Sequence, residues 1–285
     1  MNVAITGASG FVGRHLTARL EAEGHSTRAI SLRSAPQSRA IEGCDAVVNL
    51  AGENIAQRWT EAAKRRIRES RIRGTRALVA AMRADPPNML ISASACGYYG
   101  SRGDELLTEV SLPGEDFLSQ VCIDWEREAQ QASDVGVGVV ILRFGMVLGT
   151  GGGALARMLT PFKLGVGGRI GTGRQWMSWI HIDDLCDLIL FILRRSALVA
   201  GRGVLNATSP NPVTNAEFTR ELARALNRPA ALPVPALPLK LLFGEMAQVL
   251  LASQRAIPAV AMRAGAGFSF RYPEIGAALR DCLST

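Results

Sequence analysis

The sequence has few cysteines, and their spacing gives them no shared chemical role. The five cysteines are scattered along the chain, without a Cys-x-x-Cys pair or the spacing of a metal site, at Cys44, Cys96, Cys122, Cys186 and Cys282. This pattern argues against a disulfide-rich small domain and against a zinc-binding module. We therefore expect a reducing compartment and no bound metal.

Long apolar runs and a targeting segment are also missing. No stretch of the sequence is long enough to cross the hydrocarbon core of a bilayer. The chain opens directly into MNVAITGASG, without the charged segment, apolar core and cleavage site of a signal peptide. We expect a soluble, cytoplasmic protein with no membrane partner.

The net charge of +7 raises the question of a nucleic-acid partner. The basic residues are mostly arginines spread along expected helices, with one local run, KRRIRESRIR, at 64 to 73. That run predicts either a solvated helix face or a helix with one end near an anionic ligand, such as a cofactor phosphate. No recognition-helix module and no interleaving of aromatic and basic residues is present, so we expect no nucleic-acid partner.

What the sequence does contain is a regular alternation of apolar strands and amphipathic helices. With 285 residues, 48% of them hydrophobic, the chain can bury a large core. Strands are expected at 2–6, 26–32, 45–52, 88–94 and 138–144, with helices at about 11–23, 60–83 and 115–133 between them. The alternation predicts an α/β fold, a Rossmann-type, doubly wound parallel sheet with helices on both faces.

The character of the sequence changes after Phe144. Glycine-rich stretches follow, GMVLGTGGGALARML and KLGVGGRIGTGRQWMSWIHIDD, and proline and alanine dominate RPAALPVPALP. A helix is expected near VTNAEFTRELARAL, where Thr214 and Glu217 have capping-box spacing. We expect a nucleotide-binding domain at 1–146 plus about 179–207. A smaller second lobe, at 147–178 plus 208–285, would come from an insertion and the C-terminal segment.

The stretch TGASGFVG places three glycines between the first strand and the first helix. The first permits a tight turn, the second lets the backbone approach a pyrophosphate, and the third lets the helix pack on the sheet. The helix N-terminus adds unpaired N–H groups for the phosphates. The expected cofactor-binding residues of this turn are Gly7, Ser9, Gly10, Phe11, Val12 and Gly13.

The end of the second strand predicts which dinucleotide binds. NAD-binding proteins carry an acidic residue there for the ribose hydroxyls. This sequence has Ser31, Leu32, Arg33 and Ser34 instead. A hydroxyl and a guanidinium suit a 2′-phosphate. The cofactor is therefore predicted to be NADP(H), contacted by Ser31 and Arg33.

Several motifs occur in a fixed order along the chain: TGASGFVG, NLAG at 49–52, SASA, RFGMVLG at 143–149 and WIHIDDL at 179–185. In these motifs the sequence resembles the extended short-chain dehydrogenase/reductase family, in its NAD(P)-dependent epimerase and dehydratase branch. NLAGENI, GGRIGTGRQWMSWIHIDD, NPVTNAEF and FGEMAQVLL with FSFRYPEIGAAL further resemble an atypical subgroup that has its own C-terminal domain. The resemblance covers nearly the whole chain.

The resemblance implies NADP(H) at the glycine turn, with the helix of the basic run reaching back toward the cofactor phosphates. It also implies a residue that lines the nicotinamide half of the cofactor, after the strand VVILRF. Related folds often form dimers through two helices from each subunit, so a homodimer is an open possibility. The further cofactor contacts that it implies are Leu50, Ala51, Gly52, Arg71 and Met146.

One expected feature of the wider family is missing. Its members use a tyrosine and a lysine spaced Tyr-x-x-x-Lys on a helix, so that both reach the site and the tyrosine acts as acid or base. In GEDFLSQVCIDWEREA, alignment on Glu126 places Leu118 and Cys122 at these positions. Ser94 matches the family's catalytic serine or threonine. Tyr98 is the second candidate catalytic residue, because it follows the strand that carries Ser94.

One point stays open for the two tyrosines that follow Ser94. One of Tyr98 and Tyr99 could pack under its loop and the other be merely exposed. His181 and Asp183, in WIHIDD, are expected to fix the geometry of the two lobes by hydrogen bonding rather than to perform chemistry.

The leading functional hypothesis is an NADP(H)-dependent oxidoreductase or epimerase-like enzyme that acts on a small-molecule substrate. Ser94 would hydrogen-bond the reacting oxygen, and Tyr98 or a water would handle the proton. By analogy the substrate touches GTGRQWMSW, with Gln175 and Trp176 as contacts. The alternative is a non-catalytic NADP(H)-binding sensor or scaffold, which the missing tyrosine and lysine favour.

Overall fold

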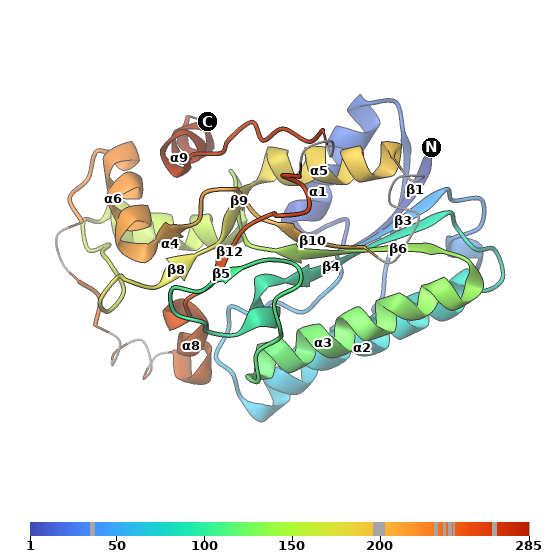
Figure 1. Cartoon of the computed structure of the whole chain (residues 1–285), viewed down its shortest axis with the longest axis horizontal. Helices are drawn as coiled ribbons and strands as arrows, with labels where there is room; N and C mark the ends of the chain where they lie inside the picture. Colours follow the sequence, from blue (N-terminus) through green and yellow to red (C-terminus); the bar gives the residue numbers. More distant parts are fainter. Residues whose placement is uncertain are drawn as a thin grey trace.

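The computed structural model describes residues 1–284 except 35–37, 196–202, 231–232, 236–237, 239–240, 242 and 264–266. A parallel sheet forms its centre, with the strand order β2-β1-β3-β4-β6-β10 (Figure 1). Every neighbouring pair in this sheet is parallel. Its strands are β1 (Asn2–Thr6), β2 (Ser26–Ile30), β3 (Ala46–Asn49), β4 (Met89–Ala95), β6 (Gly138–Phe144) and β10 (Gly203–Ala207).

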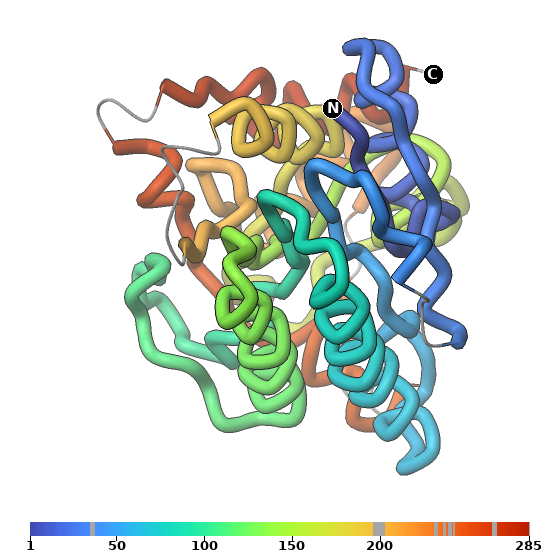
Figure 2. Tube along the Cα trace, turned by 90° about the vertical axis from the view of Figure 1, so that its right-hand side faces the viewer, coloured from blue at the N-terminus to red at the C-terminus, as the bar shows by residue number. Residues whose placement is uncertain are grey.

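Helices cover both faces of the sheet. One face packs against α1 (Phe11–Ala22) and α5 (Ile182–Arg194), and the other against α2 (Glu61–Met82) and α3 (Phe117–Gln130). Figure 2 shows α2 and α3 side by side on one side of the sheet, with α5 on the other. Alternate side chains of the buried strands supply both cores: Ile91 faces α5, and Leu90 faces α2.

The remaining elements lie mostly beyond the carboxyl ends of the strands (Figure 1). A third apolar cluster fills this region around Trp179, Phe218 and Leu279. Short strands pair here as β7 with β9, β8 with β11, and β5 with β12. The elements are β5 (Leu106–Leu107), β7 (Met146–Leu148), α4 (Gly153–Lys163), β8 (Trp176–Met177), β9 (Trp179–His181), β11 (Val213–Thr214), α6 (Asn215–Leu226), α8 (Ala247–Leu251), β12 (Arg255–Ala256) and α9 (Ile275–Leu283), with 3₁₀ turns η1 (Ser38–Ala40), η2 (Cys96–Tyr99), η3 (Gln131–Val135) and η4 (Gly244–Met246).

The doubly wound α/β fold predicted from the sequence is confirmed. The second and third strands end at Ile30 and Asn49, earlier than predicted, because the following residues leave the sheet and form loops at its carboxyl edge. The predicted cap of α6 is present, since the Thr214 side chain accepts a hydrogen bond from the N–H of Glu217. None of the described helices is both long and apolar enough to span a bilayer. Residues 35–37 of the expected polar loop, and 231–232 and 236–237 of the proline-rich stretch, lie outside the described residues.

Candidate active site

The candidate site lies where the strand order of the sheet reverses. From β1 the chain places β2 on one side and β3 on the other. The carboxyl ends of strands at such a switch point are where doubly wound folds bind ligands. In register, Thr6 is level with both Ile30 and Asn49. The glycine turn, the end of the second strand and the loop after the third strand therefore meet at one edge.

The glycine turn is closed so tightly that two of its positions have no space for a side chain. Gly7 has φ +69°, and a Cβ there would lie 2.9 Å from the carbonyl carbon and oxygen of Leu50. A Cβ on Gly13 would lie 2.2 Å from the Gly7 oxygen, which brings the first turn of α1 against the loop. The N–H of Gly10 donates to that same oxygen at 2.9 Å. These contacts explain why glycine is needed at both ends of the turn.

The first turn of α1 is open to an anion. No side chain caps it, and it contains no acidic residue. Ser9 and Gly10 are exposed, and Phe11 and Val12 are half-buried. An uncapped helix start leaves backbone N–H groups without partners, and these suit a pyrophosphate. The residues present therefore fit a dinucleotide.

The Phe11 side chain fixes the start of α1 to the loop that follows β7. The glycine-rich loop after β7 wraps its ring: a Cβ on Gly149 would lie 3.0 Å, and one on Gly152 2.6 Å, from ring atoms. Phe11 therefore offers a ligand its backbone N–H, while its ring fixes α1 to the loop.

The end of β2 presents the residues predicted to read the ribose. Ser31 and Arg33 are exposed there, and the Arg33 N–H donates to Ser31 Oγ at 3.3 Å. Within the described ranges no carboxylate lies within 4.0 Å of the Arg33 guanidinium. The fork of N–H donors is therefore free to take a phosphate.

A buried polar chain fixes the loop after β3, and the sequence analysis missed it. Thr6 Oγ1 donates to Asn49 Oδ1 at 2.6 Å and accepts from the N–H groups of Leu50 and Ala51 at 3.1 and 3.2 Å. Asn49 Nδ2 in turn donates to Thr75 Oγ1 at 2.9 Å. The available signal was a threonine and an asparagine at the ends of buried strands, since buried polar groups need partners.

Arg71 reaches this loop from α2. Its Nη1 donates to the carbonyls of Glu53 and Ile67 at 3.0 and 3.1 Å. A Cβ on Gly52 would lie 3.0 Å from the guanidinium carbon, so only glycine lets the arginine approach. Burial lowers the pKa of Arg71 below its ordinary value. The guanidinium also lies over the Trp125 ring, 5.2 Å from its centroid.

Leu118 and Cys122, which stand at the positions of the missing tyrosine and lysine, lie beside the residues that follow β4. A Cβ on Gly97 would lie 3.5 Å from Leu118 Cβ and 4.0 Å from Cys122 Sγ. Burial is the main cause that raises the pKa of the Cys122 thiol to about 11. A thiol with this pKa is protonated near neutral pH and is a poor nucleophile. Leu118 and Cys122 therefore supply an apolar wall and no acid or base.

Ser94 is buried, with 2% of its surface exposed, and its proton is already in use. Its Oγ donates to Glu126 Oε1 at 2.6 Å. The Glu126 carboxylate also accepts hydrogen bonds from Arg143 Nε and Nη2, at 2.9 and 2.8 Å, and the two side chains form a bidentate ion pair. A hydroxyl has one proton, so in this geometry Ser94 can accept a hydrogen bond from a ligand but not donate one.

The two adjacent tyrosines have different environments. Tyr99 is fully buried; its hydroxyl donates to Asn206 Oδ1 at 2.6 Å and accepts from Arg143 Nη1 at 3.0 Å. Tyr98 is half-buried, with its ring 3.3 Å from the Arg143 guanidinium carbon. Its hydroxyl makes no hydrogen bond to any residue that the structure describes. Tyr98 is therefore the tyrosine whose hydroxyl is available to a ligand.

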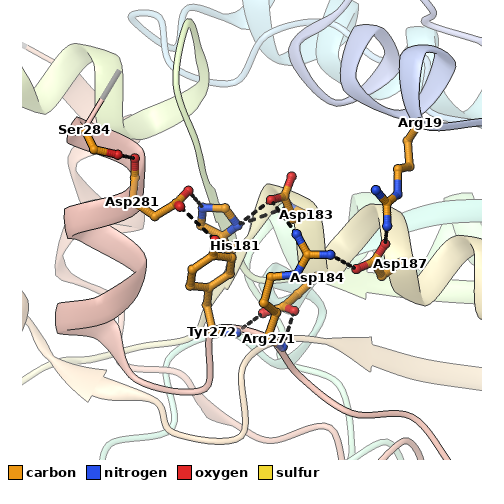
Figure 3. Close-up of polar contacts among 9 residues, drawn as sticks. All are labelled: Arg19, His181, Asp183, Asp184, Asp187, Arg271, Tyr272, Asp281 and Ser284. Carbon is orange, nitrogen blue, oxygen red and sulfur yellow. Dashed lines mark hydrogen bonds and ion pairs between the residues drawn. The ribbon is translucent and has the colours of Figure 1, made fainter. Parts of the chain in front are cut away.

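His181 and its neighbours hold the C-terminal segment against the start of α5 (Figure 3). His181 Nδ1 accepts from the N–H of Asp183 at 3.2 Å, and Nε2 lies 3.2 Å from Asp281 Oδ2 on α9. The carboxylate of Asp184 accepts two backbone N–H groups from the segment before α9, at 2.6 and 3.0 Å. This arrangement is consistent with a role in geometry rather than chemistry.

His181, Asp183 and Asp281 also lie close enough together to hold a metal ion. Burial, however, lowers the pKa of His181, which favours the neutral ring. Because Nδ1 accepts a hydrogen bond, Nε2 carries the proton of that ring and has no lone pair for a metal. Asp281 is further occupied by the Tyr272 hydroxyl, at 2.7 Å. The cluster is therefore explained as a polar clamp.

The two residues proposed by analogy to touch substrate have different roles. Gln175 is buried, and its Nε2 donates to the carbonyls of Ile170 and Leu250 at 3.2 and 3.3 Å, so its side chain is committed to the fold. Trp176 is half-buried, and its Nε1 donates to Asp104 at 2.7 Å.

Met146, the expected cofactor contact in β7, is also half-buried, and its N–H donates to the carbonyl of Ser178 at 2.8 Å.

Comparison with known proteins places the chain in a family. Residues 3–207 match the model of the NAD dependent epimerase/dehydratase family, and residues 234–282 match a domain of unknown function, DUF1731. Epimerase family protein MT2273 of Mycobacterium tuberculosis is 43% identical, over 97% of this chain and 96% of its own. YfhF of Bacillus subtilis is 37% identical, over 100% and 98%. The crystal structure of human SDR39U1 (isoform 2) with NADPH aligns over 100% of both chains, with a TM-score of 0.91 and 34% identity. The chain belongs to the NAD dependent epimerase/dehydratase family.

Proposed function

We propose that the chain is an NADP(H)-binding enzyme of the atypical short-chain dehydrogenase/reductase type, an oxidoreductase or epimerase-like enzyme acting on a small molecule. The observation that carries the cofactor is the uncapped start of α1, together with Arg33 and the absence of a carboxylate at the end of β2. The structure of human SDR39U1 with NADPH supports it. The cofactor contacts are Gly7, Ser9, Gly10, Phe11, Val12, Gly13, Ser31, Arg33, Leu50, Ala51, Gly52, Arg71 and Met146.

The proposal includes the division of the chain and its setting. Residues 1–146 plus about 179–207 form the NADP(H)-binding domain, and residues 147–178 plus 208–285 form the lobe that covers the substrate. The protein works in the cytoplasm, and a homodimer is compatible with the fold.

When bound, the nicotinamide supplies or accepts a hydride. The Tyr98 hydroxyl, free of other described partners, donates to the reacting oxygen and steadies charge that develops on it. Ser94 accepts from a substrate hydroxyl, because its own proton is held by Glu126 at 2.6 Å. When the substrate is oxidised, its hydroxyl gives its proton to Ser94 Oγ. Ser94 in turn gives its own proton to the Glu126 carboxylate.

A second function is favoured by a specific observation. Leu118 and Cys122 replace the acid-base pair, and Ser94 is buried and bonded to Glu126, so the site can be a cofactor pocket without turnover. The alternative is an NADP(H)-binding sensor or scaffold. It predicts tight cofactor binding and no oxidation of NADPH in the presence of any small molecule.

The cofactor is tested by titrating the protein with NADPH and NADH and following nicotinamide fluorescence. Arg33→Ala removes charge-assisted hydrogen bonds of about 1.5–3 kcal/mol, so the Kd for NADPH should rise by roughly 10- to 100-fold. The Kd for NADH should stay nearly the same. Arg83→Ala, an exposed arginine at the end of α2, is the matched control and should change neither affinity. Equal losses for both nucleotides would show that Arg33 does not read the 2′-phosphate.

Turnover is tested by adding a small-molecule cell extract to the NADPH complex and following absorbance of the nicotinamide. For an enzyme, Tyr98→Phe and Ser94→Ala should abolish protein-dependent oxidation and leave NADPH affinity nearly unchanged. If turnover survives both substitutions, the assignment of these residues is wrong. Binding without oxidation in the unmodified protein would favour the sensor.

A further inference from the structure

Arg255 is a half-buried cation whose guanidinium makes no hydrogen bond and no ion pair to any residue that the structure describes. It lies in β12, and its guanidinium carbon is 4.3 Å from the centroid of the Trp176 ring. Its Nε is buried without a hydrogen-bond acceptor, and no carboxylate of the described ranges lies within 4.0 Å of the guanidinium. In contrast, the more deeply buried Arg143 is paired bidentately with Glu126. A desolvated donor without an acceptor costs about 1–3 kcal/mol, so the arrangement needs an explanation.

We propose that Arg255 and Trp176 form a binding site for an anionic group of the substrate, a phosphate or a carboxylate. This inference rests on the proposed function, since it gives the substrate class for the same site. A guanidinium offers parallel N–H donors that match the oxygens of either group, and an aromatic face holds its plane in place. The Trp176 ring supplies that face.

The position of Arg255 connects this site to the loop that carries Tyr98. In the register of β12 with β5, Arg255 is opposite Leu106, and Ala256 is opposite Leu107. Ala256 and Leu107 belong to the apolar cluster on which the Tyr98 ring packs. The backbone that carries Arg255 therefore runs beside the segment that follows Tyr98, where the N–H of Arg102 donates to the carbonyl of Ser253 at 2.9 Å. The Arg255 side chain itself lies on the opposite face of β12 from Ala256.

Further contacts link Trp176 to the same region. Its indole Nε1 donates to Asp104, which lies five residues after the end of η2 at Tyr99. Its backbone N–H donates to Ser253 Oγ at 3.0 Å. A cavity of about 350 Å³ lies next to this pair: it is lined by Asp104, Gln175 and Ser253 among others, which are neighbours of Trp176 and Arg255, but not by Trp176 or Arg255 themselves. The cavity offers room for the rest of a small substrate.

The chemistry of these side chains selects an anion over other groups. A cation would be repelled by Arg255, which no described carboxylate neutralises. An aromatic ligand could not stack on the Trp176 face that the guanidinium already covers. Asp104 is held at the indole edge by Nε1 and so fixes the ring without pairing with the arginine.

The test uses the full chain saturated with NADP⁺, so that the cofactor's own phosphate sites are filled. Isothermal titration at constant ionic strength measures the Kd for two probes, inorganic phosphate and succinate. Arg255→Met keeps the apolar stem on Trp176 and removes the charge. We expect the Kd of the preferred probe to rise at least about tenfold, the loss of roughly one charge-assisted hydrogen bond. The tighter of the two probes then distinguishes a phosphorylated substrate from a carboxylic acid.

Two controls keep the result interpretable. Arg228→Met removes an exposed arginine after α6 and should leave both Kd values unchanged. Arg255→Lys keeps the charge but loses the planar fork, and should fall between the wild type and Arg255→Met. The inference is overturned if neither probe binds the wild type, or if Arg255→Met binds both as tightly. The Kd for NADP⁺, measured separately, should be the same in all variants. If the wild type does not bind NADP⁺ at all, the proposed function itself is contradicted.

Discussion

Replacing Glu126 by glutamine should lower the free energy of unfolding by about 3–5 kcal/mol, the cost of leaving one member of a buried ion pair alone. The side chains of Glu126 and Arg143 are only 11% and 4% exposed, and they make two hydrogen bonds to each other. Hydrogen bonds to the Glu126 carboxylate also keep the pKa of Arg143 above its ordinary value, although burial works against it. Arg143 would therefore remain charged and buried in the variant.

The size of the effect can be measured by thermal unfolding. For 285 residues the entropy of unfolding is roughly 0.6 kcal/mol/K near the midpoint, so Tm should fall by about 5–8 °C. Glu128→Gln, on the same helix, is the matched control. Its partner Arg76 is 62% exposed, so water can solvate the cation and the expected loss is about 1 kcal/mol or less.

A double variant separates the pair from its surroundings. Glu126→Gln with Arg143→Met removes both charges and should be less unstable than the two single losses together, because no unpaired charge remains buried. If the losses simply add, or if Glu126→Gln changes Tm by less than about 1 °C, the buried ion pair does not stabilise the fold.

Two further predictions concern the glycine turn and the polar clamp. Gly10 has no positive φ and its added Cβ would meet only the Gly7 oxygen, at 3.1 Å, so Gly10→Ala should fold normally but weaken NADPH at least about tenfold. Gly13→Ala should instead lower the free energy of unfolding by roughly 1–3 kcal/mol or more, as in an overpacked core, and so lower Tm; a variant as stable as the wild type would contradict the 2.2 Å contact. Burial lowers the pKa of His181, so below pH 6.5 the unfolded chain binds this proton more readily than the folded one. Stability should therefore fall with pH below 6.5, by up to about 1.4 kcal/mol per pH unit, and His181→Asn, which keeps a side-chain cap on α5, should flatten that slope in urea unfolding at pH 5.5 to 7.5.

Features of the fold that depend on residues close together in the sequence were predictable. The alternation of buried strands with amphipathic helices gave the doubly wound sheet, and Thr214 was correctly expected to cap α6. The need for glycine at positions 7 and 13 followed from the strand-turn-helix context, and the close contacts of both positions agree with it. The short strands around the second lobe, such as β5 and β12, were missed because two residues carry no periodicity.

Side-chain partners that come from distant parts of the chain were not predictable. Ser94, Glu126 and Arg143 lie on β4, α3 and β6, and their contacts depend on the register of two parallel strands and on how α3 crosses them. The same holds for Tyr98 and Tyr99: they are adjacent in sequence, yet one hydroxyl is bonded in the core and the other is free of described partners.

The sequence by itself determined the βαβ turn for a dinucleotide, the absence of an acidic residue at the end of the second strand, and the loss of the tyrosine and lysine pair. These features are local, because each depends on residue types at fixed spacing in one turn or one helix. Only the tertiary structure decided that the Ser94 proton is held by Glu126. It also decided that, among the described residues, the Tyr98 hydroxyl has no partner and Arg255 stacks on Trp176 without a counter-charge. The physical reason is that a buried polar group takes whichever partner the packing of distant elements brings within hydrogen-bond distance.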